Sequence, residues 1–83
     1  MRVFDPGKIR DRRLRQRVTQ GEFAKKIGIT RGYLISIEHG RAMPTAGVIA
    51  NMADALQVRE SFFFVSAVSD RLRKARRRIK HAG

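Results

Sequence analysis

Cysteine and tryptophan are both absent from this chain of 83 residues, and acidic residues are few. Without cysteine, the protein can form neither a disulfide nor a thiolate metal site. No apolar run approaches the roughly 18 residues of a membrane span, and the N-terminal sequence lacks the apolar stretch of a signal peptide. We therefore expect a cytoplasmic protein with one modest core, no metal and no other cofactor.

Basic residues are abundant. Nineteen Lys and Arg stand against seven Asp and Glu, which gives a formal net charge of +12 and a pI near 11.8. A domain pI above about 9 with clustered Lys and Arg is typical of proteins that bind nucleic acid. A solvated basic surface with no polyanionic partner explains this clustering less well.

Residues for catalysis are not assembled in any familiar pattern. His39 and His81 have no carboxylates at metal-ligand spacing, and no Gly-rich phosphate loop follows a strand pattern. Ser36 is close in sequence to Glu38 and His39, but a catalytic triad needs convergence in space, which spacing alone does not show. We therefore expect that the protein is not an enzyme.

The most informative feature is a pair of short predicted helices joined by a glycine turn. Thr19 can cap the first helix, Glu22 completes a capping box, and Gly28 suits the positive φ of the helix end. Thr30 is the N-cap candidate of the second helix, and Gly40 is its stop signal. The apolar residues spaced to face inward are Phe23, Ala24, Ile27, Tyr33, Leu34 and Ile37. Helices joined this tightly cross steeply, so the second forms a ridge that fits the DNA major groove.

These motifs resemble the lambda-repressor-like, or Cro/XRE-type, helix-turn-helix family of DNA-binding regulators. The resemblance runs from about Ile9 to Phe64. It includes a Thr-Gln-x-Glu-Phe-Ala opening, a Gly-Ile-Thr-Arg turn, a Tyr-Leu-x-x-Ile-Glu-x-Gly close and a Pro-Thr start of a later helix. It implies an all-α fold, with a compact five-helix DNA-binding domain over residues 1–64 and the motif at about 19–40.

Three further helices complete the expected domain. The first opens at Pro6-Gly7, a fourth runs from Thr45 to Leu56, and a short fifth passes through residues 62–64. Further residues expected to face inward are Ile9, Arg13, Val18, Val48, Ile49, Met52, Ala53, Leu56, Phe63 and Phe64. Arg17 lies where relatives usually carry glycine, so we expect the turn that follows the first helix to depart from the family pattern.

Residues 65–83 are predicted to form a basic amphipathic C-terminal helix or tail. Apolar residues recur every three or four positions from Val65 onward, with Arg and Lys between them. Phe62 occupies a family position that is usually polar and exposed. The residues expected at a dimer interface are Phe62, Val65, Val68 and Leu72. Packing on the same domain, a frayed tail and DNA contact are the alternatives for this segment, and membrane binding is disfavoured.

The resemblance places base recognition on the exposed positions of the second motif helix. These candidate base contacts are Thr30, Arg31, Gly32, Ile35 and Ser36. Arg31 is the strongest candidate, because a guanidinium can donate two hydrogen bonds to O6 and N7 of guanine. The candidate phosphate contacts are Gln20, Tyr33, His39 and Arg41. The resemblance also implies a structural ion pair between Arg13 and Glu38.

The expected function is sequence-specific regulation of transcription by a cytoplasmic, nucleoid-associated protein of bacterial or phage type. We expect a repressor that binds double-stranded DNA as a homodimer on an inverted-repeat operator, with recognition helices about 34 Å apart. An antitoxin or controller that binds DNA and a protein partner is the alternative. An RNA-binding role rests on the arginine-rich C-terminal segment alone.

Overall fold

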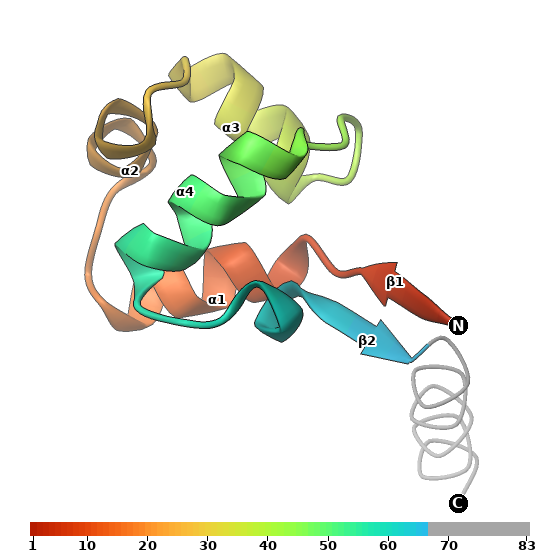
Figure 1. Cartoon of the computed structure of the whole chain (residues 1–83). Coiled ribbons are helices and arrows are strands. Elements are labelled where there is room, and N and C mark those ends of the chain that lie inside the picture. The colour runs from red at the N-terminus through yellow and green to blue at the C-terminus, as the bar shows by residue number, and fades with distance from the viewer. Residues whose placement is uncertain (67–83) are drawn as a thin grey trace, which may run out of the picture.

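Four α-helices, one short 3-10 helix and two short strands make up the computed structural model, which describes residues 1–66. In chain order they are β1 (Arg2–Phe4), α1 (Gly7–Arg15), α2 (Gln20–Ile27), α3 (Arg31–Glu38), α4 (Ala46–Leu56), the 3-10 helix η1 (Glu60–Phe63) and β2 (Phe64–Ser66). The strands lie at the end of the domain opposite α2 (Figure 1). None of the helices in this part of the chain has the length and apolar character to cross a membrane.

The predicted starts of α2, α3 and α4 are confirmed by side-chain caps. The hydroxyls of Thr19, Thr30 and Thr45 each accept a hydrogen bond from the backbone N–H three residues on, at 3.1 to 3.2 Å. The Glu22 carboxylate in turn accepts a hydrogen bond from the Thr19 backbone N–H. Hydrogen bonds with the side chain and then the backbone of Thr19 lower the pKa of Glu22 below its ordinary value of 4.5. Gly28 ends α2 with a left-handed φ of 79°.

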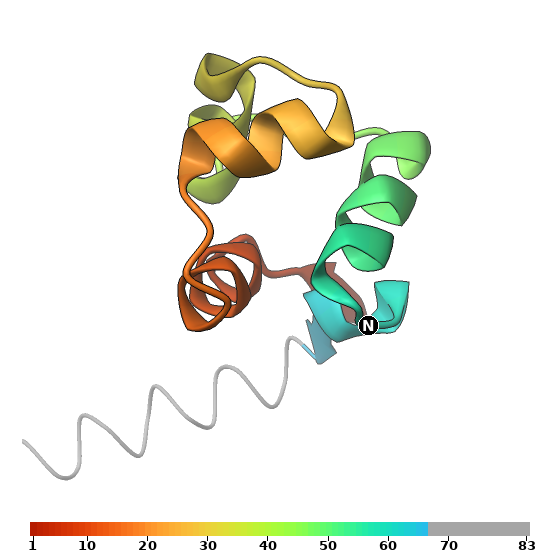
Figure 2. The same cartoon turned by 90° about the vertical axis from the view of Figure 1, so that its left-hand side faces the viewer.

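The inward faces of the four α-helices form one core, which Phe63 of η1 completes. The buried apolar residues are Ile9, Phe23, Ala24, Ile27, Leu34, Ile37, Ile49, Met52, Ala53, Leu56 and Phe63. The sequence pattern predicted ten of these to face inward, and the family resemblance implied Phe63. Figure 2 views the domain with α2 across the top, α1 below it and α4 to the right. Arg13 is buried as expected, and the remaining apolar residues expected inside are half-buried at the edge of this core: Val18, Tyr33, Val48 and Phe64.

The expectation of an all-α, five-helix fold is wrong for the first and the last of the described residues, which form strands. β1 and β2 pair antiparallel, with Val3 opposite Val65 and Phe4 opposite Phe64. The ring of Phe4 lies 6.3 Å from that of Phe63 and 5.6 Å from that of Phe64, measured between centroids. The extended backbone of β1 and β2 is favoured because Phe4 packs against Phe63 and Phe64, which are distant from it in the sequence.

The segment after α4 therefore differs from the predicted one. Residues 60–63 form a 3-10 turn in place of the fifth α-helix. Val65 and Ser66 belong to β2, so the predicted C-terminal helix does not begin at Val65. The three-and-four spacing from Val65 onward did not reveal this, because a strand partner that lies far away in the sequence leaves no local periodicity. The rest of that predicted helix lies outside the described residues.

Phe62 is half-buried, whereas the family resemblance implied an exposed side chain. The Nζ atom of Lys8 lies 5.0 Å from the centre of the Phe62 ring, in a cation-π contact. The ring also meets that of Phe63 edge-on, with centroids 5.8 Å apart. The domain itself thus covers part of the side chain that had suggested a dimer interface.

Two residues other than glycine have a left-handed backbone. Arg17, just after α1, and Gln57, at the end of α4, both have a φ of 57°. This conformation costs an L-residue about 1 kcal/mol more than it costs glycine. Arg17 thus adopts the backbone conformation that a glycine would adopt. We had expected the turn to depart from the family pattern, and this expectation is wrong.

Candidate nucleic-acid interface

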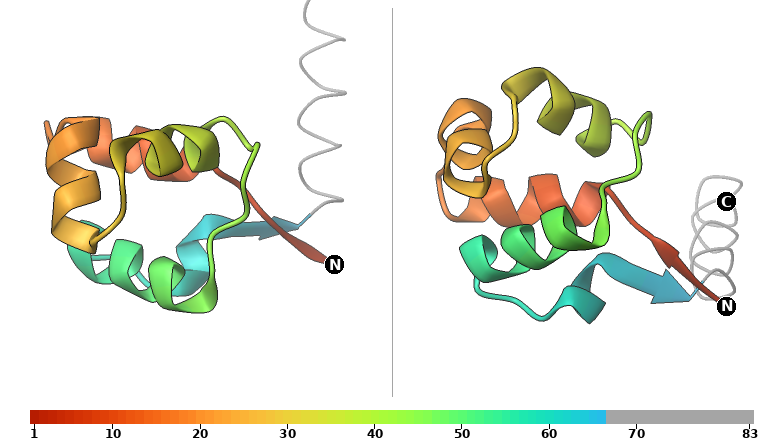
Figure 3. Two further views of the ribbon diagram at one scale, coloured as in Figure 1. Left: turned by 90° about the horizontal axis from the view of Figure 1, so that it is seen from above. Right: turned by 45° about the horizontal axis from the view of Figure 1, so that its top comes forward.

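Helix α3 lies at the outside of the domain. In Figures 1 and 3, none of the other described elements lies over its outer side. Its inner side is fixed by Leu34 and Ile37, both fully buried in the core. Because one face is held in this way, the opposite face is presented rigidly to a partner.

The candidate base contacts lie along this free side of α3. Thr30, Arg31 and Gly32 are exposed at the start of the helix, and Ile35 and Ser36 are half-buried one turn later. A Cβ atom at Gly32 would meet no other atom within 4 Å. Within residues 1–66, the Arg31 side chain makes no hydrogen bond or ion pair. Its guanidinium is therefore free to donate to a bound molecule.

The candidate phosphate contacts lie on α2, on α3 and in the turn that follows α3. They are Gln20 at the start of α2, Tyr33 within α3, and His39 and Arg41 after it. His39 and Arg41 are exposed, and Tyr33 is half-buried. The Nε2 atom of Gln20 donates to Oε1 of Glu38 at 3.2 Å. One of the two amide hydrogens of Gln20 thus binds within the protein, and the other remains for a phosphate.

A buried ion pair joins α1 to the end of α3. Nε and Nη2 of Arg13 donate to the two carboxylate oxygens of Glu38, at 2.8 and 3.0 Å. The side chains are only 5% and 2% exposed. Nη1 of Arg13 also donates to the carbonyl of Val18 at 2.9 Å. Two parallel bonds fix both position and orientation, so this pair sets how α3 sits against α1 and the turn before α2.

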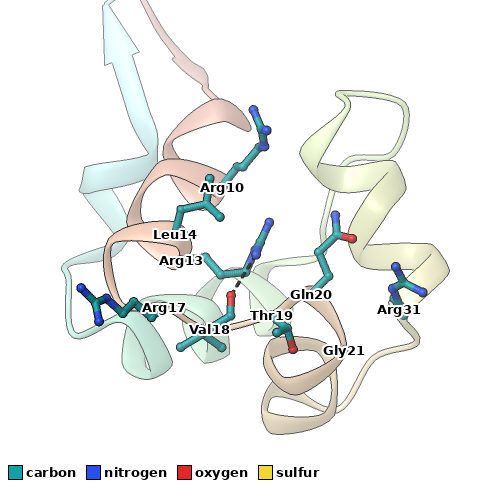
Figure 4. A pocket seen from close by; sticks show the side chains of 9 residues that line it. All are labelled: Arg10, Arg13, Leu14, Arg17, Val18, Thr19, Gln20, Gly21 and Arg31. Atoms are coloured by element: carbon teal, nitrogen blue, oxygen red, sulfur yellow. Dashed lines mark hydrogen bonds between the residues drawn. The ribbon is translucent and has the colours of Figure 1, made fainter.

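A basic groove runs between α1 and the first turn of α2 and ends beside α3 (Figure 4). Its volume is about 720 Å³. Its walls are formed by Arg10, Arg13, Leu14, Arg17, Val18, Thr19, Gln20, Gly21 and Arg31. None of these lining residues is acidic. The groove therefore joins two of the predicted contact residues, Gln20 and Arg31, to a cluster of α1 arginines.

Neither Arg10 nor Arg17 was predicted from the sequence to contact DNA. A signal was present, because Arg10, Arg13 and Arg17 follow one another at spacings of three and four residues, which places them along one side of a helix. The sequence did not show that α2 packs beside that face. Only the packing of α1 against the following turn makes these arginines part of a groove.

The fold and the exposed α3 define a helix-turn-helix protein. A family model described as helix-turn-helix matches residues 9–63, and the chain belongs to this family. It is of the lambda-repressor-like, Cro/XRE type, as the sequence motifs indicated. No curated protein matches the chain significantly.

Several solved structures share this fold. The restriction-modification controller protein C.AhdI from Aeromonas hydrophila is 24% identical, with a TM-score of 0.68 over 71% of this chain and 89% of that one. The P22 c2 repressor, solved with a synthetic operator, is 20% identical, with a TM-score of 0.69 over 74% and 92%. The clp gene regulator ClgR from Corynebacterium glutamicum is 23% identical, with a TM-score of 0.74 over 93% and 83%.

Proposed function

We propose that the protein is a transcriptional repressor that binds a specific inverted repeat in double-stranded DNA as a homodimer. The observation that carries this proposal is the exposed side of α3, where the Arg31 side chain makes no bond within residues 1–66 and Gly32 faces open space. Membership of the helix-turn-helix family supports it. So does the shared fold with the P22 c2 repressor, whose structure was solved with an operator.

In this proposal, different residues of α3 contact different bases. Arg31 donates two hydrogen bonds to a guanine, Ser36 bonds a second base, and Ile35 packs on a thymine methyl. Thr30 caps the helix and lies next to the same bases. The proposed phosphate contacts, Gln20, Tyr33, His39 and Arg41, hold the protein in register without reading sequence.

The proposed homodimer places two α3 helices about 34 to 36 Å apart, one turn of the double helix. We place its interface at Phe62, Val65, Val68 and Leu72. Phe62 and Val65 are half-buried where η1 and β2 end the domain, and Val68 and Leu72 lie outside the described residues. Two-fold symmetry of the protein then requires two-fold symmetry of the DNA site.

Selection from a random duplex pool tests the proposed function. We expect enrichment of an inverted repeat whose half-sites are about one helical turn apart, bound roughly 10³-fold or more tightly than a scrambled duplex. Gel-shift titrations at two salt concentrations give the ratio. Steeply salt-dependent binding to every duplex, with no enriched sequence, would contradict a sequence-specific regulator.

Gly32→Ala should have opposite effects on the stability of the protein and on its affinity for DNA. The new methyl group meets nothing in the protein, so the free energy of unfolding should rise by up to about 1 kcal/mol. The same methyl group lies where DNA would approach the helix backbone, so affinity for the selected duplex should fall. Gly47→Ala in α4 is the matched control, with an equally open position and an affinity change within about twofold. Unchanged DNA binding by Gly32→Ala would show that the backbone does not approach the bases there.

A controller protein that binds DNA and a protein partner is the second candidate. The shared fold with C.AhdI, a restriction-modification controller, favours it. A stoichiometric partner that co-purifies with the protein and alters its affinity for the selected duplex would support this candidate over a repressor that acts alone.

A further inference from the structure

We infer that the basic groove is a second phosphate-binding strip, in which Arg10 and Arg17 hold backbone phosphates that flank the bases contacted by α3. This inference rests on the proposed function, because it takes duplex DNA as the occupant. It adds two residues on α1 and its following turn to contacts that the motifs had placed only on and around α2 and α3.

The first argument is the absence of partners, within residues 1–66, for three of the four arginines that line the groove. Within the described part of the chain, the side chains of Arg10, Arg17 and Arg31 make no hydrogen bond or ion pair. Among the other arginines of residues 1–66, Arg15, Arg41 and Arg59 likewise make no side-chain bond, whereas Arg2, Arg12 and Arg13 are tied to the protein. Nε of Arg12 donates to the carbonyl of Leu56 at 3.3 Å, and Nη2 of Arg2 donates to carbonyls of the η1 and β2 segment. Within residues 1–66, Arg10, Arg17 and Arg31 thus have no structural side-chain bond that explains where they lie.

The second argument is that the groove keeps its positive charge. Glu38 binds Arg13 of the groove wall, but the Glu38 side chain is 2% exposed and both of its carboxylate oxygens are bonded to Arg13. Since this pair is neutral and buried, it does not offset the charges of Arg10, Arg17 and Arg31. An uncompensated set of guanidinium groups around a concave surface favours a polyanion.

The third argument is the course of the groove. In Figure 4, Arg17 and Arg31 lie at opposite ends, with Thr19, Gln20 and Gly21 between them. The side chains of Arg10 and Gln20 extend toward the same side of the opening. A DNA strand that follows the groove from Arg31 therefore passes the first turn of α2 and reaches the α1 arginines. Its phosphates would lie next to bases within reach of α3.

The fourth argument is the backbone of Arg17. Its φ of 57° is a conformation that glycine adopts at lower cost. Strained residues of this kind cluster where their side chains have a function. An arginine in place of glycine supplies a cation at the end of the groove, which glycine cannot do.

Salt dependence of DNA binding is the first test. Each phosphate contact contributes about 0.9 to the slope of log K against log salt concentration. The double variant R10Q/R17Q should therefore lower this slope by about 1.8, with an unchanged preference for the selected duplex over a scrambled one. The matched control R15Q/K25Q removes two exposed charges outside the groove and should keep the wild-type slope. Equal slopes for the two double variants would overturn the inference.

Neutral phosphates locate the contacts. Methylphosphonate groups are placed one at a time along the selected duplex, and the affinity of each duplex is measured for wild type and R10Q/R17Q. At phosphates held by the groove, the wild type loses affinity on neutralisation and the variant loses none. If every position weakens both proteins to the same extent, the groove holds no phosphate.

Arg17→Gly tests whether a reduced salt slope reflects the loss of a phosphate contact or a loss of stability. It should raise the melting temperature, since it relieves the left-handed backbone, and lower the salt slope by about 0.9. An Arg17→Gly variant that melts at a higher temperature and keeps the full salt slope would show that Arg17 holds no phosphate.

The proposed function and the proposed phosphate strip can fail separately. If the wild type shows no sequence preference, the proposed function is contradicted. If the wild type shows a preference but R10Q/R17Q keeps the full salt slope, only the phosphate strip is contradicted.

Discussion

Replacing Glu38 by alanine should destabilise the protein by about 3 to 5 kcal/mol. The substitution leaves the Arg13 guanidinium, whose side chain is 5% exposed, without the two bonds that now compensate its burial. Gln20 loses its partner as well. Small domains have only about 5 to 15 kcal/mol of stability in total. Urea unfolding followed by circular dichroism should therefore show a much lower midpoint.

Two controls identify the source of that loss. Asp11→Ala removes an exposed carboxylate from α1 and should change stability by no more than about 0.5 kcal/mol. The double variant R13M/E38L removes both charges and should recover most of the stability, because no unpaired charge remains buried. A loss below about 1 kcal/mol for Glu38→Ala would mean that the ion pair does not hold α1 against α3.

Replacing Arg31 by alanine should remove about 1 to 3 kcal/mol of discrimination at one base pair in each half-site. This corresponds to a loss of about 5- to 150-fold in preference for the correct base. The physical reason is that a planar guanidinium can donate two bonds to one guanine edge, and Arg31 is exposed with no competing bond within residues 1–66. Repeating the duplex selection with the variant should yield a site that is degenerate at that position.

Arg31→Lys keeps the charge but lacks the two-donor fork. It should lose base preference while it keeps the affinity for scrambled DNA and the wild-type salt slope. Lys26→Ala, a change to an exposed cation on α2, should leave the selected sequence unaltered. If Arg31→Ala weakens binding equally on every sequence, Arg31 contacts phosphate and does not read a base.

Much of the domain could be predicted from the sequence because its signals are local. The caps at Thr19, Thr30 and Thr45 are hydrogen bonds that close over three residues. The glycine at the end of α2 meets the need for positive φ within a single residue. The buried faces follow the helical repeat, which can be counted along the chain.

The candidate site was predicted only in part. The exposed positions of α3 follow from the same repeat, and the resemblance implied the pair of Arg13 and Glu38, which the structure contains. Arg10 and Arg17 were missed because the groove forms only where α1 and the turn after it pack beside the start of α2. Their place beside Gln20 depends on how α1 packs against the turn before α2.

The sequence by itself determined the helix starts, the core residues and the family, since each rests on short-range bonds or on linked motifs. Only the tertiary structure decided that β1 pairs with β2, that Lys8 covers Phe62, and that the α1 arginines line one groove. These features join residues that are distant in the chain, and their free energy comes from packing between elements. No local pattern records such packing, so it becomes visible only when the whole domain is folded.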